Sequence, residues 1–293
     1  MSGVLVPGVP ERAYLRGDPP PAATGCIVGE PGLYLDLPAD VYHADTALAP
    51  HLGRSLSASG AKVLLQSPAK YDYQRAHPKP PTDAMEFGSA IHSLILGGPQ
   101  VRAVDSDSWR TKAAQAERDE LRAEGRIPLL AAEYERADIM RAAVTGHPLA
   151  SAILSKGQAE TSAYWIDGET GITCRARPDW LRSNAIADLK SAADASPAGF
   201  SKAVANFGYA LSAAHYQDGI EALTGERLPF VFIVVEKEPP HLVGVYDLDE
   251  DALRYGREQM REARAMFARC ESEGLWPGLG SEIVTLSLPR WVT

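Results

Sequence analysis

The sequence predicts an α/β domain, because segments with the two-residue periodicity of strands alternate with segments that have the pattern of capped amphipathic helices. Residues 172–177 and 185–190 alternate apolar and polar side chains. Residues 228–235 are almost wholly apolar, as expected for a strand that is covered on both faces. Residues 82–96 and 249–273 have the helical pattern, and the second of these segments ends at Gly274.

The composition is that of a globular protein with a large core. The chain has 293 residues, of which 45% are hydrophobic, and its formal net charge is −9. No apolar run approaches the ~20 residues that span a bilayer, and the start of the chain lacks the pattern of a secretory signal, so we expect a cytoplasmic protein. The negative charge argues against broad nonspecific nucleic-acid binding, but it leaves room for an enzyme whose basic residues line one groove. The three cysteines are widely spaced, which excludes a cysteine-pair zinc or iron–sulfur motif.

Taken in order, the chain divides into a short arm and one domain. Residues 1–31 are rich in Pro, Gly and Ala, and we expect a flexible N-terminal arm there. Residues 32–293 then form a single domain, with a short strand within 32–42 and a helix that Ser57 or Ser59 caps. A helical insertion is expected at about 100–155, with helices over 108–121 and 129–144. Strands follow at 160–166, 172–177, 185–190, 228–235 and 242–248, and an interrupted helix at 198–223 starts after Ser196.

The predicted hairpin at residues 172–190 carries the candidate chemistry. Asp188 and Lys190 lie two residues apart in a strand, so their side chains project from the same face. Asp179 follows Pro178 at the end of the preceding strand and can reach the same space across the hairpin. Two carboxylates bind a hard cation such as Mg²⁺, and a neighbouring lysine can orient a water or contact a phosphate. The spacing therefore suits metal-assisted phosphodiester cleavage.

These residues also resemble a known family. Pro178-Asp179 followed by Asp188-Leu189-Lys190 is similar to the PD-(D/E)xK nuclease signature in its Asp form. The opening segment at residues 55–71, with its Leu-Ser-x-Ser run, resembles that of RecE-type (exodeoxyribonuclease VIII-like) phage and prophage exonucleases. The resemblance implies a PD-(D/E)xK core, a central mixed β-sheet flanked by helices, with the helical insertion outside it.

The resemblance also implies a ligand set. The Gly88–His92 spacing is similar to the Gly-x-x-x-His segment of these nucleases, in which the histidine lies beside the metal. It implies that His92, Asp179, Asp188 and the Leu189 carbonyl hold Mg²⁺ or Mn²⁺, two ions in the active complex, and that Lys190 orients the attacking water. Glu160 is either an additional catalytic acid near the metals or a charge at a strand edge.

Three further residues are expected to bind substrate. Tyr216 falls on the tyrosine position of a helix that resembles the Gln-x-x-x-Tyr helix of this superfamily. Ser212 stands at the usual glutamine position, which is a departure from the pattern, and Gln217 points about 100° away from Tyr216 around the helix. Arg175 and Arg177, on the strand before Asp179, complete the expected substrate-binding set.

The function implied is a 5′→3′ exonuclease that degrades linear double-stranded DNA and leaves 3′ overhangs for recombination by single-strand annealing. Its relatives form homo-oligomeric rings around DNA and work with a single-strand annealing protein in the bacterial host, and both partners are expected here. Two alternatives stay open. One is an endonuclease of the restriction or repair type, and the other is a non-catalytic DNA-binding module with the same fold.

Overall fold

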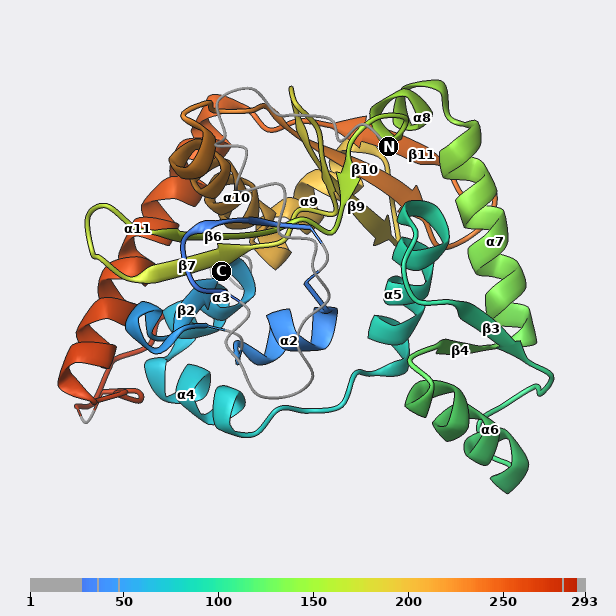
Figure 1. The fold of residues 1–293 in the computed structure, drawn as a ribbon, viewed down its shortest axis with the longest axis horizontal. Helices are drawn as coiled ribbons and strands as arrows, with labels where there is room; N and C mark the ends of the chain where they lie inside the picture. The colour runs from blue at the N-terminus through green and yellow to red at the C-terminus, as the bar shows by residue number, and fades with distance from the viewer. Residues whose placement is uncertain (1–27, 36, 47, 281, 289–293) are drawn as a thin grey trace.

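The computed structural model describes residues 28–35, 37–46, 48–280 and 282–288, which form two principal β-sheets with helices packed around them (Figure 1). The predicted α/β class is confirmed. Within these residues no helix is both long enough and apolar enough to cross a membrane.

The first sheet has four strands in the order β1-β6-β7-β2. They are β1 (Gly32–Tyr34), β6 (Ser162–Ile166), β7 (Thr173–Ala176) and β2 (Ser55–Ser57). Strand β2 runs parallel to β7, and the other neighbours are antiparallel. The sheet therefore joins the opening Leu-Ser-x-Ser segment to the strand that precedes Asp179.

The second sheet has five strands in the order β11-β10-β9-β8-β5. They are β11 (Val243–Tyr246), β10 (Phe230–Glu236), β9 (Ile186–Ala192), β8 (Trp180–Leu181) and β5 (Gln158–Ala159). Only β9 and β10 are parallel, and the other neighbours are antiparallel. The predicted hairpin is thus wrong in one respect: β9 pairs with the short β8, whereas the strand expected at 172–177 is β7 of the other sheet. The chain changes sheets between Ala176 and Trp180, and Asp179 lies in that connection.

Helices cover both faces of the β9–β10 pair, which explains why β10 is apolar on each face. On one face, Ile186 and Phe232 pack with residues of α9 (Pro197–Phe207) and α10 (Tyr209–Thr224). On the other face, Leu189 and Ile233 pack with residues of α5 (Asp83–Leu96) and α7 (Ala131–Gly146). The predicted interruption of the helix at 198–223 is Gly208, whose φ of 61° separates α9 from α10.

A further layer contains α3 (Ala58–Gln66) and α11 (Glu250–Glu273), which pack against each other and against α10. The Ser57 side chain caps α3, and the Asp249 side chain caps α11 by accepting a hydrogen bond from the Ala252 N–H at 2.8 Å. Gly274, with φ of 64°, ends α11. Shorter elements complete this side of the molecule: α2 (Ala39–Ala44), the 3₁₀ helix η1 (Pro50–Leu52) and α4 (Pro68–Ala76).

The insertion is not wholly helical. It contains α6 (Lys112–Ala123), α7 and α8 (Pro148–Leu154), together with a parallel pair of strands, β3 (Val101–Val104) and β4 (Ile127–Leu130), which α6 connects. The helix expected at 129–144 begins only at residue 131, since Leu129 and Leu130 belong to β4. Arg122 of α6 forms a two-contact ion pair with Glu86 of α5, at 2.9 and 2.8 Å, which ties the insertion to the helix that carries His92.

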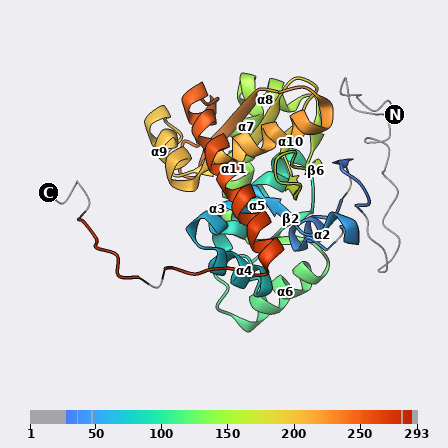
Figure 2. The same ribbon diagram turned by 90° about the vertical axis from the view of Figure 1, so that its left-hand side faces the viewer.

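The two ends of the described chain differ in their packing. Residues 1–27 of the expected arm lie outside the described residues, but Val28 is fully buried and bridges to Leu48, so the packed domain begins before residue 32. At the other end, Trp276 stacks on Tyr71 with ring centroids 5.4 Å apart. Beyond it, residues 282–288 extend away from the body of the protein (Figure 2).

Candidate functional site

Strand β9 places Asp188 and Lys190 side by side, as the two-residue periodicity predicts. The Lys190 Nζ atom contacts Asp188 Oδ2 in an ion pair, and the two side chains are only 23% and 8% exposed. Burial raises the pKa of Asp188 to about 6, although the Lys190 ammonium opposes the shift. Burial alone would lower the pKa of Lys190, but the Asp188 and Asp179 carboxylates outweigh it and raise that pKa, so the ammonium stays protonated. The pair therefore presents a permanent cation beside an acid that ionises near neutral pH.

The connection between β7 and β8 brings Asp179 to the same point. Its Oδ2 accepts a hydrogen bond of 2.6 Å from the Leu189 N–H and lies 4.0 Å from Lys190 Nζ. Its Oδ1 lies 3.6 Å from His92 Nδ1, which reaches the site from α5. Asp179 thus links the connection, β9 and α5. The proximity of Asp179 to Lys190 agrees with the prediction, but Asp179 reaches it from the connection between the two sheets and not across a hairpin of β7 and β9.

Glu160 joins the site through a break in the strand that the sequence predicts at 160–166. The residue lies between β5 and β6 with φ of 53°, a left-handed conformation that is uncommon for a residue other than glycine. Its N–H donates to the Asp179 carbonyl at 3.1 Å. Strain of this kind concentrates at functional sites, because the surrounding structure must enforce it. Glu160 therefore lies next to Asp179, and its role as a catalytic acid stays a prediction.

Three of these side chains form a candidate metal site. Ligand atoms of His92, Glu160 and Asp179 all lie within 4.8 Å of one another. Two carboxylates and an imidazole nitrogen match the donors that Mn²⁺ accepts, and the carboxylates with water match the preference of Mg²⁺ for oxygen. The donor set therefore fits a divalent cation.

The expected ligand Asp188 is not part of this side-chain cluster. Its carboxylate contacts Lys190, and the Leu189 carbonyl accepts from Lys190 Nζ at 3.3 Å. Lys190 thus contacts two of the four expected ligands, and their binding to a metal stays a prediction.

Arg175 and Arg177 are engaged inside the protein. Arg175 forms an ion pair with Asp45 at 2.6 Å and donates to the Ser55 hydroxyl, and its side chain is 11% exposed. Arg177 forms an ion pair with Glu160 at 2.9 Å and donates to the Leu37 carbonyl at 2.6 Å, with 10% of its side chain exposed. In this structure Arg177 holds Glu160 in place. The predicted contact of both arginines with substrate stays a prediction.

Tyr216 of α10 is half-buried, and its ring centroid lies 6.0 Å from that of Phe230 at the start of β10. Burial raises the pKa of Tyr216 well above its usual value, and the negative charges of Asp188, Asp179 and Glu160 contribute to the shift. The Gln217 amide instead donates to the Leu228 carbonyl at 2.8 Å, in the buried layer at the start of β10. Gln217 therefore does not take the place of the usual glutamine at the site.

Sequence reasoning missed two residues that border Lys190. Tyr209, the first residue of α10, has its ring centroid 5.6 Å from Lys190 Nζ, and Lys62 of α3 lies 5.4 Å from the same centroid. Burial lowers the pKa of Lys62 to about 8, and the positive charge of Lys190 adds to this effect. Lys62 lies in the Leu-Ser-x-Ser segment, which was the only signal in the sequence that it belongs near the site.

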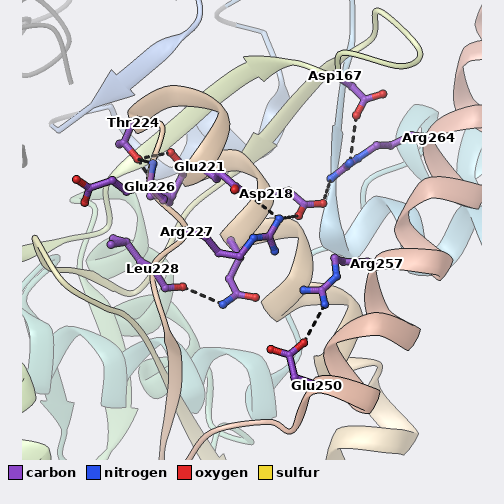
Figure 3. A network of polar contacts seen from close by, with 12 residues as sticks. Asp167, Asp218, Glu221, Thr224, Glu226, Arg227, Leu228, Glu250, Arg257 and Arg264 are labelled. Carbon is purple, nitrogen blue, oxygen red and sulfur yellow. Dashed lines mark hydrogen bonds and ion pairs between the residues drawn. The ribbon is translucent and has the colours of Figure 1, made fainter. Parts of the chain in front are cut away.

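A buried polar network holds α10 against α11 and the first sheet (Figure 3). Arg264 of α11 donates to Asp167 at 3.1 Å and to Asp218 at 3.0 Å, and it also approaches His215 at 3.3 Å. Arg227 pairs with Asp218 from the opposite side at 3.2 Å. The network fixes the helix that carries Tyr209 and Tyr216, so it supports the geometry of the site from behind.

The family can now be stated. A family model described as "PDDEXK-like domain of unknown function (DUF3799)" matches residues 57–286, which is most of the chain and includes every site residue described above. The chain belongs to this family. The match confirms the predicted membership of the PD-(D/E)xK superfamily.

One solved structure agrees with this chain at the level of fold. A "Putative exonuclease" from Eubacterium rectale is similar with a TM-score of 0.60 and 16% identity, over 87% of this chain and 97% of that one. The alkaline exonuclease LHK-Exo from Laribacter hongkongensis matches with 16% identity over 63% of this chain and 87% of its own, at a TM-score of 0.27. No curated protein matches the chain. The protein therefore has the fold of a PDDEXK nuclease-like domain with a candidate divalent-metal site.

Proposed function

We propose that this protein is a divalent-metal-dependent deoxyribonuclease that degrades linear double-stranded DNA from its ends, in the 5′→3′ direction, and leaves 3′ overhangs. The observation that carries the proposal is the convergence of His92, Glu160 and Asp179 within 4.8 Å, beside the Asp188–Lys190 pair. A metal bound there supplies an acidified water and neutralises charge on the phosphate. The exonuclease names of the solved structures with a similar fold support the choice of reaction.

The residues of the chain have distinct roles in this proposal. His92, Glu160 and Asp179 would hold the cation, Mg²⁺ or Mn²⁺, and Asp188 would add a carboxylate for a second ion. Lys190 keeps its proton and contacts the attacking water or the phosphate. Tyr216 closes the site on the side of α10. Because the donors come from α5, the turn at Glu160 and the β7–β8 connection, the site depends on the packing of the whole domain.

A nuclease assay tests the reaction. Linear and covalently closed circular duplexes are incubated with the protein and Mg²⁺ or Mn²⁺, with EDTA added in parallel. We expect degradation of the linear substrate alone, its loss in EDTA, and protection by a block at the 5′ end but not at the 3′ end. Cutting of the closed circle would favour an endonuclease, and binding without any cleavage would favour a non-catalytic DNA-binding module.

An Asp179→Asn variant makes the test specific to the metal site. The asparagine side chain can still accept the Leu189 hydrogen bond, so the connection keeps its anchor while one negative ligand is lost. We expect cleavage to fall by at least a hundredfold, with affinity for Mn²⁺ reduced in calorimetry. Glu169→Gln, at the exposed tip between β6 and β7, is the matched control and should leave both unchanged. Wild-type cleavage by Asp179→Asn would remove this site from the mechanism.

The proposal includes the assembly that the resemblance implies, a homo-oligomeric ring that acts with a single-strand annealing protein. Ile283 and Leu286 in the extended C-terminal segment are almost fully exposed, at 100% and 87%, and offer an apolar surface for such contacts. Light scattering of the purified protein, with and without residues 282–293, tests the ring. A monomer in both cases would contradict it.

A further inference from the structure

Lys62 is a second lysine at the candidate site, and it approaches from a different element than Lys190. Its Nζ lies 5.4 Å from the centroid of the Tyr209 ring, while Lys190 Nζ lies 5.6 Å from the same centroid. A tyrosine ring attracts cations through the negative charge of its π face. Two ammonium groups, one from α3 and one from β9, therefore lie near the same ring.

The stem of Lys62 is held in place by the junction of α9 and α10. Gly208 at this junction has φ of 61°, and a Cβ added there would lie 3.3 Å from Lys62 Cε and 3.5 Å from Lys62 Cδ. The absence of a side chain at Gly208 thus gives the methylene groups of Lys62 their path along the junction. Packing therefore directs the ammonium group to the Tyr209 ring, and the group does not extend freely into solvent.

The charge of Lys62 has no counter-ion in the described part of the chain. Among the described residues no carboxylate oxygen lies within 4.0 Å of its Nζ and no hydrogen bond involves it, whereas Lys190 contacts Asp188. The side chain is half-buried, and burial together with the Lys190 charge lowers the pKa of Lys62, while the Asp188 carboxylate, which contacts Lys190 and not Lys62, only partly opposes the shift. Two cations on one ring, only one of them paired, repel each other unless an anion lies near them.

We propose that Lys62 is a substrate-binding residue whose ammonium contacts a phosphate of the DNA strand that is being cut, next to the phosphate that Lys190 contacts. This inference rests on the proposed function for the identity of the ligand. A phosphate supplies the missing counter-charge and relieves the repulsion between the two lysines. Tyr209 then serves as a positioning residue that aims both ammonium groups at the same strand.

The test compares Lys62→Met with Lys62→Arg and with Lys70→Met. Methionine keeps the unbranched stem that packs along Gly208 and removes the charge, and arginine keeps the charge. Lys70, exposed on the neighbouring α4, is the matched control for loss of one positive charge. Affinity for a short 5′-phosphorylated duplex is measured in EDTA over a salt series, and single-turnover cleavage is measured with Mg²⁺.

For Lys62→Met we expect the slope of log K against log salt to become shallower by about 0.9, the value for one lost phosphate contact on duplex DNA. We expect kcat/KM to fall about 10- to 100-fold, as for loss of one hydrogen bond to a charged group. Lys62→Arg should retain most of both, and Lys70→Met should match the wild type. If Lys62→Met fails to fold in a thermal melt, Lys62→Gln is measured in its place with the same expectation.

The outcomes separate this inference from the proposed function. An unchanged slope and rate in the Lys62 variants, with an active wild type, would overturn the role of Lys62 and leave the nuclease proposal standing. A reduced slope in a protein that never cleaves DNA would overturn the nuclease proposal and leave the phosphate contact standing. Absence of DNA binding by the wild type would overturn both.

Discussion

A double-mutant cycle on the Asp188–Lys190 ion pair tests its contribution to stability and to activity. We expect the losses of stability to be non-additive, whereas activity is lost in every variant. Lys190→Met removes a cation that contacts the Asp188 carboxylate and lies 4.0 Å from Asp179, and no other cation among the described residues forms an ion pair with Asp188. Two unit charges 4 Å apart attract by about 4 kcal/mol at an effective dielectric constant of about 20. Because one side chain of the pair is 23% exposed, solvent screens part of this attraction. We expect Lys190→Met to lower the free energy of unfolding by about 3 kcal/mol, as for a buried pair that loses one partner.

Asp188→Asn should lower the free energy of unfolding by less than Lys190→Met does. The Lys190 ammonium still has Asp179 as a nearby acid, and the repulsion between the Asp188 and Asp179 carboxylates disappears. We expect a loss of about 1 kcal/mol from Asp188→Asn alone, the size of an ordinary polar contact. In the double variant neither member of the pair is left as an unpaired charge, so we expect a loss of about 1–2 kcal/mol in total and a coupling energy of about 2–3 kcal/mol. All three variants should lack nuclease activity.

The cycle is measured by urea unfolding in EDTA at pH 8, with cleavage of a linear duplex measured in parallel. At pH 8 Asp188 is ionised, because its pKa is raised only to about 6. At pH 5 the carboxyl is protonated in the folded protein, so most of the coupling should vanish. Additive losses at pH 8 would refute the electrostatic reasoning, and an active double variant would refute the role of both residues in catalysis.

Two further predictions concern the layers behind the site. Burial lowers the pKa of His215 to about 3, below its usual 6.5. Between these two values the unfolded chain binds a proton that the folded protein does not bind, so the free energy of unfolding falls as pH falls from 6.5 toward 3. Between pH 6.5 and pH 5, His215→Gln should lose about 1.5–2 kcal/mol less than the wild type in urea unfolding, and equal losses would contradict the assignment. Gly256→Ala should lower stability by about 1–3 kcal/mol in the same assay, because its Cβ would collide with the Ala210 carbonyl where α10 and α11 pack closely. The matched control Gly88→Ala meets no atom within 4 Å and should instead stabilise α5 by about 0.5–1 kcal/mol.

The close contact at Gly256 bears on function, since α10 carries Tyr209 and Tyr216. The Arg264 network and the Gly256 contact both fix this helix against α11, one by charge and the other by the absence of a side chain. A loss of activity in Gly256→Ala at temperatures where the protein remains folded would show that the site depends on this packing. Unchanged activity there would limit the contact to stability.

Local patterns were sufficient for the individual elements of the site. Residue type predicted that Ser57 or Ser59 caps a helix and that helices start at Thr82 and Asp249, and the structure has the caps at Ser57, Thr82 and Asp249, whose side chains each accept from a free N–H group of the first turn. The shared face of Asp188 and Lys190 follows from the period of a strand, which holds wherever the strand lies in the sheet.

Strand pairing and long-range contacts were harder to predict from the sequence. The strand at 172–177 was placed opposite β9, but it pairs in the other sheet, because a strand's alternation does not specify its neighbour. The β3–β4 pair was missed within an insertion whose helices dominate the pattern, and Pro128 lies in β4. The left-handed turn at Glu160 was missed for a related reason, since the break depends on a hydrogen bond to Asp179 nineteen residues away.

The sequence by itself was enough to recognise an α/β domain of the PD-(D/E)xK type, and it predicted Asp179, Asp188, Lys190 and His92 as the residues that carry its chemistry. Only the tertiary structure decided that Glu160 joins His92 and Asp179, that Arg175 and Arg177 are held in internal ion pairs, and that Lys62 meets Lys190 at Tyr209. The physical reason is the range of the interactions. Helix caps and strand faces depend on neighbours a few residues apart, whereas a site is assembled from side chains that only the packing of two sheets and three helices brings together.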